Sequence, residues 1–543
     1  MVFARRSTTL LAAIIASCAM VLSLTACTSD NKTVVDGQTT VTSNSAGGVA
    51  VFTPSDGITL NQQMPLNKWA KLVPDLAKAL VDAGFKKGDI DHTTSDSLAK
   101  QSRAIQDFVV DHLSNNTTDD SGIAIAPDNM TLLVAPVVEA DASTRQYGDY
   151  VSQNLSTNDA TDGGATSDGE SSEDDSSKDD SSNTESDSTA SDEQAQAVDR
   201  LVSSLKLAKE SGMHVVLLGN SIEGYKPDAF VKFSDAQTIG KLQAEKMVSK
   251  LKLDKASKDN PKYIEVLLPY TAVDEKGNAN DSTFAQEAFR GIWQVLGSYY
   301  QKGVVESPSG TLDGKSTEND WQAVAYDAAK EGSTAKVLDK RLAKTDGQST
   351  LTRIDGIITM NDYIASEVVK ELDDLGYTGS AADINPQITI SGIVGNITGK
   401  KDLSRDAVPD PIKSPENDNA NDSSSSDDDA DEDTSASDKD RDSQWPLVTG
   451  YGAYVSNIPS IVNGKQWMTG MEDRQTIATD IAQACAKLNK DEALNSMPSI
   501  RNSEVGGVKK IPTISEPLLA VSASNLKSAL IDPGYISLAD AGL

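Results

Sequence analysis

Side chains that ligate metals or form cross-links are scarce in this chain of 543 residues. It contains three cysteines and three histidines, and His92, His112 and His214 are scattered along the sequence. Zinc and similar sites need such ligands in close, regular spacings, so we expect no metal and no other cofactor. No nucleophile accompanied by an acid or base is evident, and the sequence therefore does not predict an enzyme.

Positive charge is also in short supply, since 49 Lys and Arg stand against 81 Asp and Glu and the formal net charge is −32. Much of the excess lies in two Ser- and Asp-rich tracts, residues 156–194 and 414–443. Both lack aromatic side chains and cannot bury enough surface to offset the entropy of ordering. We expect disordered, solvated insertions at about 152–195 and 404–444, with cation binding or adhesion as the alternative. The acidity argues against nucleic acid as a partner.

The longest apolar run, residues 10–24, is too short for a comfortable transmembrane helix, which needs about 20 apolar residues. It follows Arg5 and Arg6, and its last residue, Leu24, begins the sequence LTAC that ends at Cys27. This pattern is typical of a secretory signal. The small–small–Cys ending resembles the bacterial lipobox, which implies cleavage before Cys27 and acylation of that cysteine. We therefore predict a lipoprotein signal peptide over 1–26, with a plain secretory signal as the alternative.

Residues 27–47 are rich in Ser, Thr, Asn and Gly, which is typical of a flexible tether. With Cys18 in the signal and Cys27 acylated, Cys485 is left alone, so no disulfide is expected. A helix over 473–488 would place Cys485 on its apolar side as a core thiol. Without signal, tether and acidic tracts roughly 400 residues remain, which allows two domains.

Strand-like and helix-like segments alternate through the rest of the chain, in two successive sets. This alternation predicts an α/β protein with two doubly wound parallel-sheet lobes, an N-terminal lobe over 48–255 and a C-terminal lobe over 256–543. Ligands in such sheets bind at the carboxyl ends of the strands. The predicted strands include 48–54, 122–127, 214–220, 263–270, 353–362, 446–452 and 466–471, and the predicted helices 67–85, 96–113, 196–212, 241–251, 284–303 and 473–488, with another beginning near Met130.

Five segments resemble, in their order and spacing, the ribose- and xylose-binding class of bacterial solute-binding proteins, which has the type I periplasmic-binding fold. The resemblance implies two lobes joined by hinge strands that close on a solute, with a tail at 505–543 crossing the hinge. The segments are residues 68–85, 122–129, 354–366, 448–482 and 511–542.

The same resemblance implies a function. It predicts a lipid-anchored binding protein of an ABC importer that holds a mono- or oligosaccharide between its lobes and delivers it to a membrane permease. We expect a monomer on the extracellular face of a bacterial cell membrane, in a Gram-positive organism. The alternative is a surface sensor or adhesion lipoprotein that reuses the fold without transport.

Sugar sites of this class stack aromatic rings on the sugar and use carboxylates, amides and guanidinium groups for its hydroxyls. Asn361 and Asp362 match the amide and carboxylate that end one strand of the class. Trp69 and Trp321 match aromatic positions near the cleft, although a core position suits Trp69 equally well.

Other ligand positions of the class carry different residues here. Asn220 stands where the class has the arginine of an Asp-Arg pair, Tyr451 lies in the strand end that normally offers an aspartate, and Glu472 replaces a lysine. The pocket therefore binds a different solute or has lost this kind of binding. Residues 388–396 and 446–454 are alike, and if the first is the tenth strand, Asn396 rather than Tyr451 approaches the cleft.

Overall fold

The computed structural model describes residues 46–55, 65–115, 125–138, 146–150, 153–156, 185–273, 280–328, 330–343, 351–381 and 445–543. They belong to one compact unit, Ser45–Leu543. The predictions for the signal peptide, Cys27, most of the tether and the insertion at 404–444 lie outside the described residues, as does Asn396.

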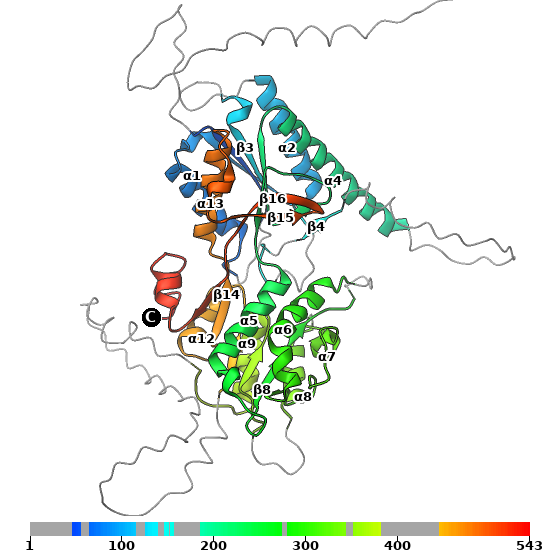
Figure 1. The fold of residues 1–543 in the computed structure, drawn as a ribbon, viewed down its shortest axis with the longest axis vertical. Helices are drawn as coiled ribbons and strands as arrows, with labels where there is room; N and C mark the ends of the chain where they lie inside the picture. Colours follow the sequence, from blue (N-terminus) through cyan, green and yellow to red (C-terminus); the bar gives the residue numbers. More distant parts are fainter. Residues whose placement is uncertain are drawn as a thin grey trace, which may run out of the picture. The chain divides into compact units, whose positions relative to one another are not determined.

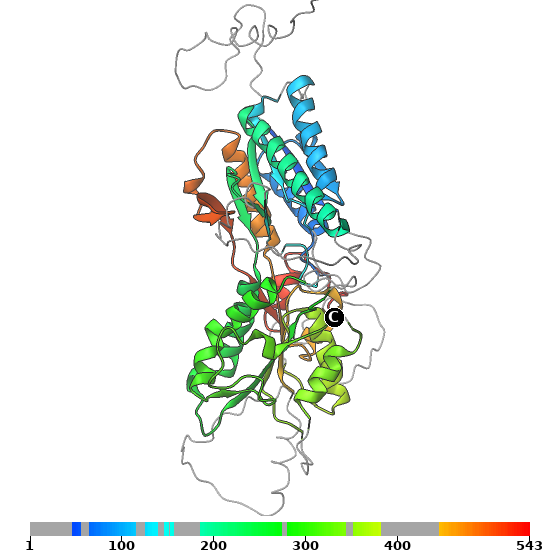
Figure 2. The same ribbon diagram turned by 90° about the vertical axis from the view of Figure 1, so that its right-hand side faces the viewer.

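The first lobe is built on a seven-stranded sheet that is parallel except for one antiparallel pair at its edge (Figure 1). α1 (Trp69–Asp82) and α13 (Arg474–Leu488) cover one face, and α2 (Leu98–Asn115) and α4 (Glu185–Glu210) cover the other (Figure 2). The strand order is β15 (Ile500–Val505), β16 (Val508–Ser515), β7 (Ala229–Lys232), β5 (His214–Leu218), β3 (Met130–Val134), β1 (Gly48–Pro54) and β2 (Ile90–Ser95).

The sequence of β1 explains why this sheet is covered on both faces. Val49 and Val51 lie in the core with α1 and α13, whereas Ala50 and Phe52 lie in the core with α2 and α4. A strand buried on both faces is apolar at successive positions, as is usual in parallel sheets. The helices instead repeat their apolar residues every three or four positions. In α1 the buried stripe consists of Trp69, Leu72, Leu76 and Leu80.

The second lobe has a smaller parallel sheet with α5 (Ala236–Leu251) and α6 (Thr283–Gln301) on one face and α8 (Ser333–Arg341) and α9 (Asp362–Asp374) on the other. Its order is β10 (Val305–Glu306), β8 (Lys262–Val266), β12 (Gly356–Ile358) and β13 (Leu447–Thr449). Short pairs complete the fold: β9 (Leu268–Pro269) with β11 (Ala325–Tyr326), β14 (Met468–Met471) with β17 (Leu519–Ser522), and β4 (Asn154–Leu155) with β6 (Ser221–Ile222).

In both sheets the strand order reverses beside the first strand, since β1 lies between β2 and β3 and β8 lies between β10 and β12. Among the described helices and strands, consecutive elements lie in different lobes at three places: from β7 to α5, from β14 to α13, and from β16 to β17. The predicted fold class, two doubly wound parallel-sheet lobes joined by hinge strands, is confirmed.

The sequence prediction divides the lobes at residue 255, but the structure does not divide there. α5 packs with α6 in the second lobe, whereas α13, β15 and β16 belong to the first. A boundary drawn in sequence order assumes a single passage between lobes, and three passages mix the two halves of the chain.

Two elements of the first lobe also differ from the prediction. The sequence predicts a strand at 122–127 and a helix near Met130, but the third strand is β3 (Met130–Val134), after a turn of 3-10 helix at Pro127–Asn129. Periodicity cannot distinguish a short buried strand from a helix. α4 begins at Glu185, inside the predicted insertion, rather than at residue 196.

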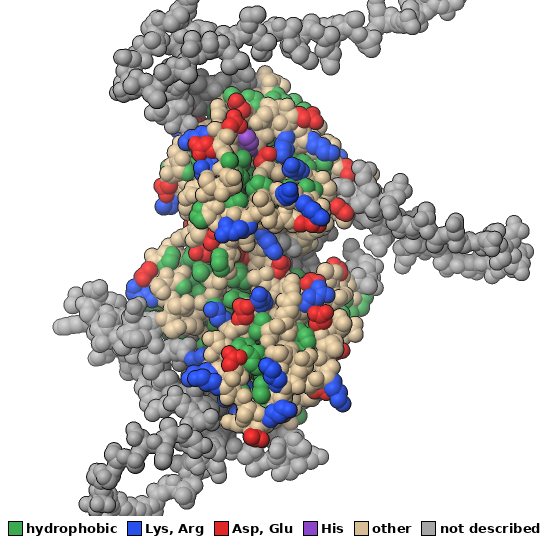
Figure 3. Space-filling view, viewed as in Figure 1, with side chains coloured by type: hydrophobic (Ala, Val, Ile, Leu, Met, Phe, Trp, Pro, Cys, Tyr) green, Lys and Arg blue, Asp and Glu red, His purple; other side chains and the backbone are tan. Residues whose placement is uncertain are grey.

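On the face drawn in Figure 3, acidic and basic side chains are interspersed over both lobes. This distribution fits a sequence whose charge excess is concentrated in two tracts. Among the helices of the described ranges, none combines the length and apolar character required to cross a membrane.

Candidate functional site

Asn361 and Asp362 lie at the carboxyl end of the second lobe's sheet, where Asn361 precedes α9 and Asp362 is its first residue. Asn361 caps the helix, because its Oδ1 accepts a hydrogen bond from the backbone N of Ile364 at 2.9 Å. Its Nδ2 donates to Oε1 of Gln146, a residue of the first lobe's connections, at 3.1 Å. Both Asn361 and Asp362 are fully buried.

The carboxylate of Asp362 accepts three hydrogen bonds from its own lobe. The donors are the backbone N of Tyr454 at 2.9 Å, Nε2 of Gln466 at 2.7 Å and Oγ1 of Thr469 at 2.8 Å. Burial raises the pKa of Asp362 to about 6 although these donors favour the charged form. In this conformation the carboxylate joins the end of β12 to the segment around β14.

Glu472 and Tyr451 meet where two of the strands pass between the lobes. The carboxylate of Glu472 accepts hydrogen bonds from the backbone N and the Oγ of Ser234, at 2.7 and 2.6 Å. The hydroxyl of Tyr451 lies 2.6 Å from the same Oγ and 3.4 Å from Glu472. Burial raises the pKa of both groups. Their contacts join the passage after β7 to the passage after β14.

Trp69 and Asn220 are buried in the first lobe. The Trp69 indole makes edge-to-face contacts with Tyr150 and Phe233, with ring centroids 5.0 and 5.7 Å apart. Asn220 bridges two backbone segments, since its Oδ1 accepts from the N of Gln153 and its Nδ2 donates to the O of Pro136, both at 2.9 Å. Trp69 therefore lies in the core, as the alternative interpretation of this residue expects.

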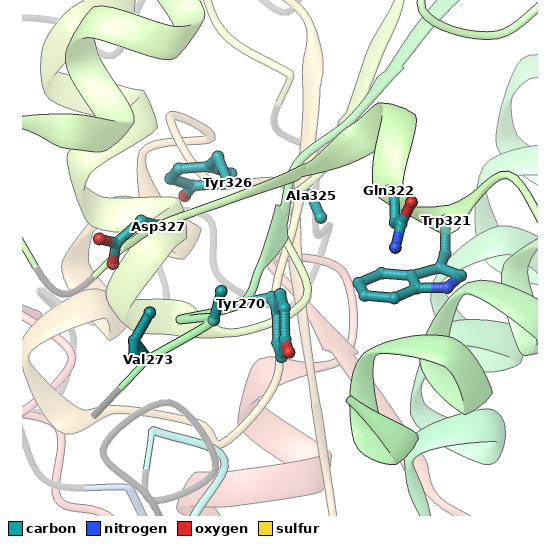
Figure 4. A pocket seen from close by; sticks show the side chains of 8 residues that line it. Tyr270, Val273, Trp321, Gln322, Ala325, Tyr326 and Asp327 are labelled. Carbon is teal, nitrogen blue, oxygen red and sulfur yellow. The ribbon is translucent and has the colours of Figure 1, made fainter. Parts of the chain in front are cut away.

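Trp321 lines a pocket of about 280 Å³ in the second lobe (Figure 4). Its indole packs edge-to-face on Tyr270, with centroids 5.2 Å apart and an interplanar angle of 84°. Tyr270 directly follows β9, and Asp327 directly follows β11, so the pocket opens at the carboxyl ends of this parallel strand pair. The full lining is Tyr270, Ala272, Val273, Trp321, Gln322, Ala325, Tyr326 and Asp327.

The pocket combines apolar rings with hydrogen-bonding groups. Tyr270 and Trp321 stand side by side, whereas the carboxylate of Asp327 lies on the opposite side of Tyr270 (Figure 4). Asp327 is oriented by Oγ1 of Thr271, which donates to its Oδ1 at 3.1 Å, and Lys330 Nζ lies 3.7 Å from its Oδ2. Rings bind the apolar faces of a small molecule, and a few placed polar groups fix its orientation.

The predicted residues thus fall into separate places. Asn361, Asp362, Tyr451 and Glu472 form hydrogen bonds at or near the strand ends of the second lobe, Trp69 and Asn220 are packed within the first lobe, and Trp321 lines the pocket. Sequence analysis missed Tyr270, Gln322 and Asp327. The one sequence signal that points to them is the predicted strand 263–270, which ends at Tyr270, because ligand groups gather at strand ends.

In the part of the chain that the structure describes, no group of three or more His, Cys, Asp and Glu side chains is arranged to hold a metal ion.

No protein-family model and no curated protein matches this chain. Solved structures similar to it include an ABC transporter solute-binding protein from Clostridium phytofermentans with bound β-D-glucose, at 17% identity over 91% of this chain and 99% of that chain, with a TM-score of 0.44.

Two others are a carbohydrate transporter solute-binding protein from Chloroflexus aurantiacus in complex with D-glucose and a periplasmic ribose ABC transporter protein from Conexibacter woesei. The first is 18% identical over 92% of this chain and 98% of that chain, with a TM-score of 0.43. The second is 13% identical over 90% of this chain and 96% of that chain, with a TM-score of 0.42. At such values no residue role is carried over from these proteins to this chain.

Proposed function

We propose that this protein is an extracytoplasmic solute-binding protein of an ABC importer, anchored to the membrane through acylated Cys27, that binds a mono- or oligosaccharide. The solute contacts the second lobe at the Trp321 pocket and is enclosed when the lobes close. A membrane permease then takes it from the closed protein.

Two parallel-sheet lobes linked by three passages of the chain support a closing motion. Such linkers let two rigid lobes rotate about a few residues, and a solute that favours the closed form shifts the population toward it. The hydrogen bonds of Ser234, Tyr451 and Glu472 lie at these passages and would set the axis of rotation.

The lining of the pocket supports a sugar as the solute, because it combines two aromatic rings with a carboxylate and an amide. Trp321 and Tyr270 offer apolar ring faces, and Asp327 and Gln322 offer partners for hydroxyl groups. Asp327 is held by Oγ1 of Thr271 and lies 3.7 Å from Lys330 Nζ, and a solute hydroxyl would add a further hydrogen bond to its carboxylate. An anionic solute would instead be repelled by this carboxylate. A neutral polyol with an apolar face fits this combination.

A sensor or adhesion protein without transport is the second candidate. The buried contacts of Asn361, Asp362, Tyr451 and Glu472 favour it, because these side chains are engaged within the protein in this conformation. Sugar binding is tested in one screen, in which the unfolding midpoint is measured over a panel of mono- and oligosaccharides. At a hundredfold excess over Kd, a sugar should add about 2.7 kcal/mol and shift the midpoint by several degrees. No shift with any sugar would contradict sugar binding and favour the second candidate or a solute that is not a sugar.

Trp321→Ala should weaken binding of the sugar found in that screen about thirtyfold, because truncating an anchoring tryptophan costs about 2 kcal/mol. Calorimetric titration measures the affinity. Tyr299→Ala is the matched control, since this partly exposed aromatic lies on α6 outside the pocket and should leave the affinity unchanged. Equal affinities for wild type and Trp321→Ala would contradict a site at this pocket.

The anchor is tested separately from the solute. Cys27→Ala should abolish incorporation of labelled palmitate in cells and release the protein from the membrane fraction, because the lipobox cysteine carries the acyl chains. Cys485→Ala is the control, since this thiol is buried in the first lobe's core. Unchanged labelling of Cys27→Ala would contradict the lipid anchor.

A further inference from the structure

A short segment, Gln146–Tyr150, lies between the strand ends of the two lobes, and its C-terminal half is held by the first lobe. The carboxylate of Asp149 accepts hydrogen bonds from Lys68 Nζ at 2.9 Å and from the backbone N of Trp69 at 3.0 Å. The hydroxyl of Tyr150 donates to the O of Lys68, and its ring stacks on Phe233 with centroids 4.8 Å apart.

The N-terminal half of the same segment is held by the second lobe. The carbonyl of Gln146 accepts from the hydroxyl of Tyr454 at 2.7 Å, and its side-chain Oε1 accepts from Asn361 Nδ2 at 3.1 Å. Tyr147 is 1% exposed and belongs to the second lobe's core. Its ring centroid lies 4.7 Å from that of Phe284 and 6.3 Å from that of Tyr451.

Gly148 connects the two halves where no side chain fits. Its φ is +99°, in the region that favours glycine, and an added Cβ would lie 2.5 Å from the backbone O of Asn67. The chain can therefore turn from one lobe to the other within a single residue, close against the first lobe.

We propose that Gln146–Tyr150, named here the strap, is an intramolecular latch that holds the lobes together without solute and that Gln146 and Tyr147 leave the second lobe when a solute enters. The strap lies outside the lining of the Trp321 pocket, but it occupies Asn361, which the sequence predicts as a solute ligand, and buries the ring of Tyr147 in the second lobe's core. The competition between the strap and a solute rests on the proposed function, whereas the linkage of the two lobes by the strap is independent of it.

The hold is tested by the distance between spin labels at Lys78→Cys on α1 and Lys336→Cys on α8, two exposed positions on different lobes. The full chain is used with Cys18 and Cys27 replaced by serine, and Cys485 stays unlabelled because it is buried. Without sugar, the doubly labelled protein with a wild-type strap should give one narrow distribution of label-to-label distances. Tyr147→Ala and Gly148→Ala should lengthen and broaden it, whereas Tyr147→Phe, which keeps the ring packing, should not.

Gln146→Ala provides a milder variant if truncation at Tyr147 impairs folding, because it removes the side-chain contact to Asn361 and leaves the core intact. Circular dichroism and the unfolding midpoint establish that each variant is folded. A distance distribution unchanged in every folded strap variant would overturn the proposal, whatever any sugar does.

Competition is tested with the sugar that shifts the midpoint most. If the strap-free state is about 10% populated, Tyr147→Ala should bind that sugar about tenfold more tightly than wild type. Equal or weaker affinity would overturn the competition. A longer distance together with no sugar binding in any variant would support the latch and contradict the proposed function, so the two failures are distinguishable.

Discussion

Replacing Arg341 with methionine should lower the free energy of unfolding by about 3 kcal/mol, because it leaves the carboxylate of Glu265 buried without its counter-charge. Arg341 is 8% exposed and Glu265 is fully buried, and their N–O distance is 3.3 Å. The loss falls at the lower end of the usual range of about 3–5 kcal/mol. Ser307 Oγ and the backbone N of Ser309 still donate to Glu265, at 2.7 and 2.8 Å.

The same change should also disturb the Trp321 pocket. The guanidinium of Arg341 donates to the backbone O of Val324 at 3.0 Å and to the O of Val266, so it ties α7 (Trp321–Val324) to β8. Sugar affinity should fall together with stability.

Urea denaturation measures the stability, and the double variant Glu265→Gln/Arg341→Met is the control. Removing both charges should recover part of the loss, because no uncompensated charge is then buried. A double variant less stable than Arg341→Met alone would contradict this explanation.

Asp362 should make the protein lose stability as the pH rises from about 4 to 7. Its pKa is about 6 in the folded protein and near 3.8 when unfolded, so the folded state binds more protons between these values. The free energy of unfolding therefore falls through this window, by about 3 kcal/mol from Asp362, since one pKa unit corresponds to about 1.4 kcal/mol. Asp362→Asn should remove this component, which urea denaturation across the pH range measures as a difference from wild type.

Asp313→Asn provides a control of opposite sign. Asp313 is exposed, and the backbone N–H of Lys315, with further hydrogen bonds from Ser316, lowers its pKa. Replacing this carboxylate should therefore remove a contribution to the free energy of unfolding that increases with pH. Parallel stability curves for wild type and Asp362→Asn would contradict the burial of an ionisable carboxylate at this position.

The helices and the fold class were accessible from sequence because they follow from local patterns. The stripe of Trp69, Leu72, Leu76 and Leu80 predicts α1, and each of these residues is buried as expected. Cys485 lies in the core, as its place on the apolar side of α13 predicts. Such patterns need only a few neighbouring residues, so a single sequence reveals them.

The site could not be predicted to the same extent, because its contacts join distant parts of the chain. Gln146 meets Asn361 across 215 positions, and Ser234 meets Glu472 across 238. Neither Gln146 nor Tyr147 lies in a periodic segment, so no local pattern marks them. The resemblance to sugar-binding proteins led to Trp321 and to the strand ends, but not to the residues that fill the space there.

We propose that a sugar binds at the Trp321 pocket and is enclosed by the lobes. A crystal structure grown with the sugar that shifts the unfolding midpoint most tests it directly. We expect a sugar ring against Trp321 or Tyr270, with a hydroxyl within hydrogen-bonding distance of Asp327 or Gln322. A sugar bound elsewhere on the chain, with only solvent in this pocket, would contradict it.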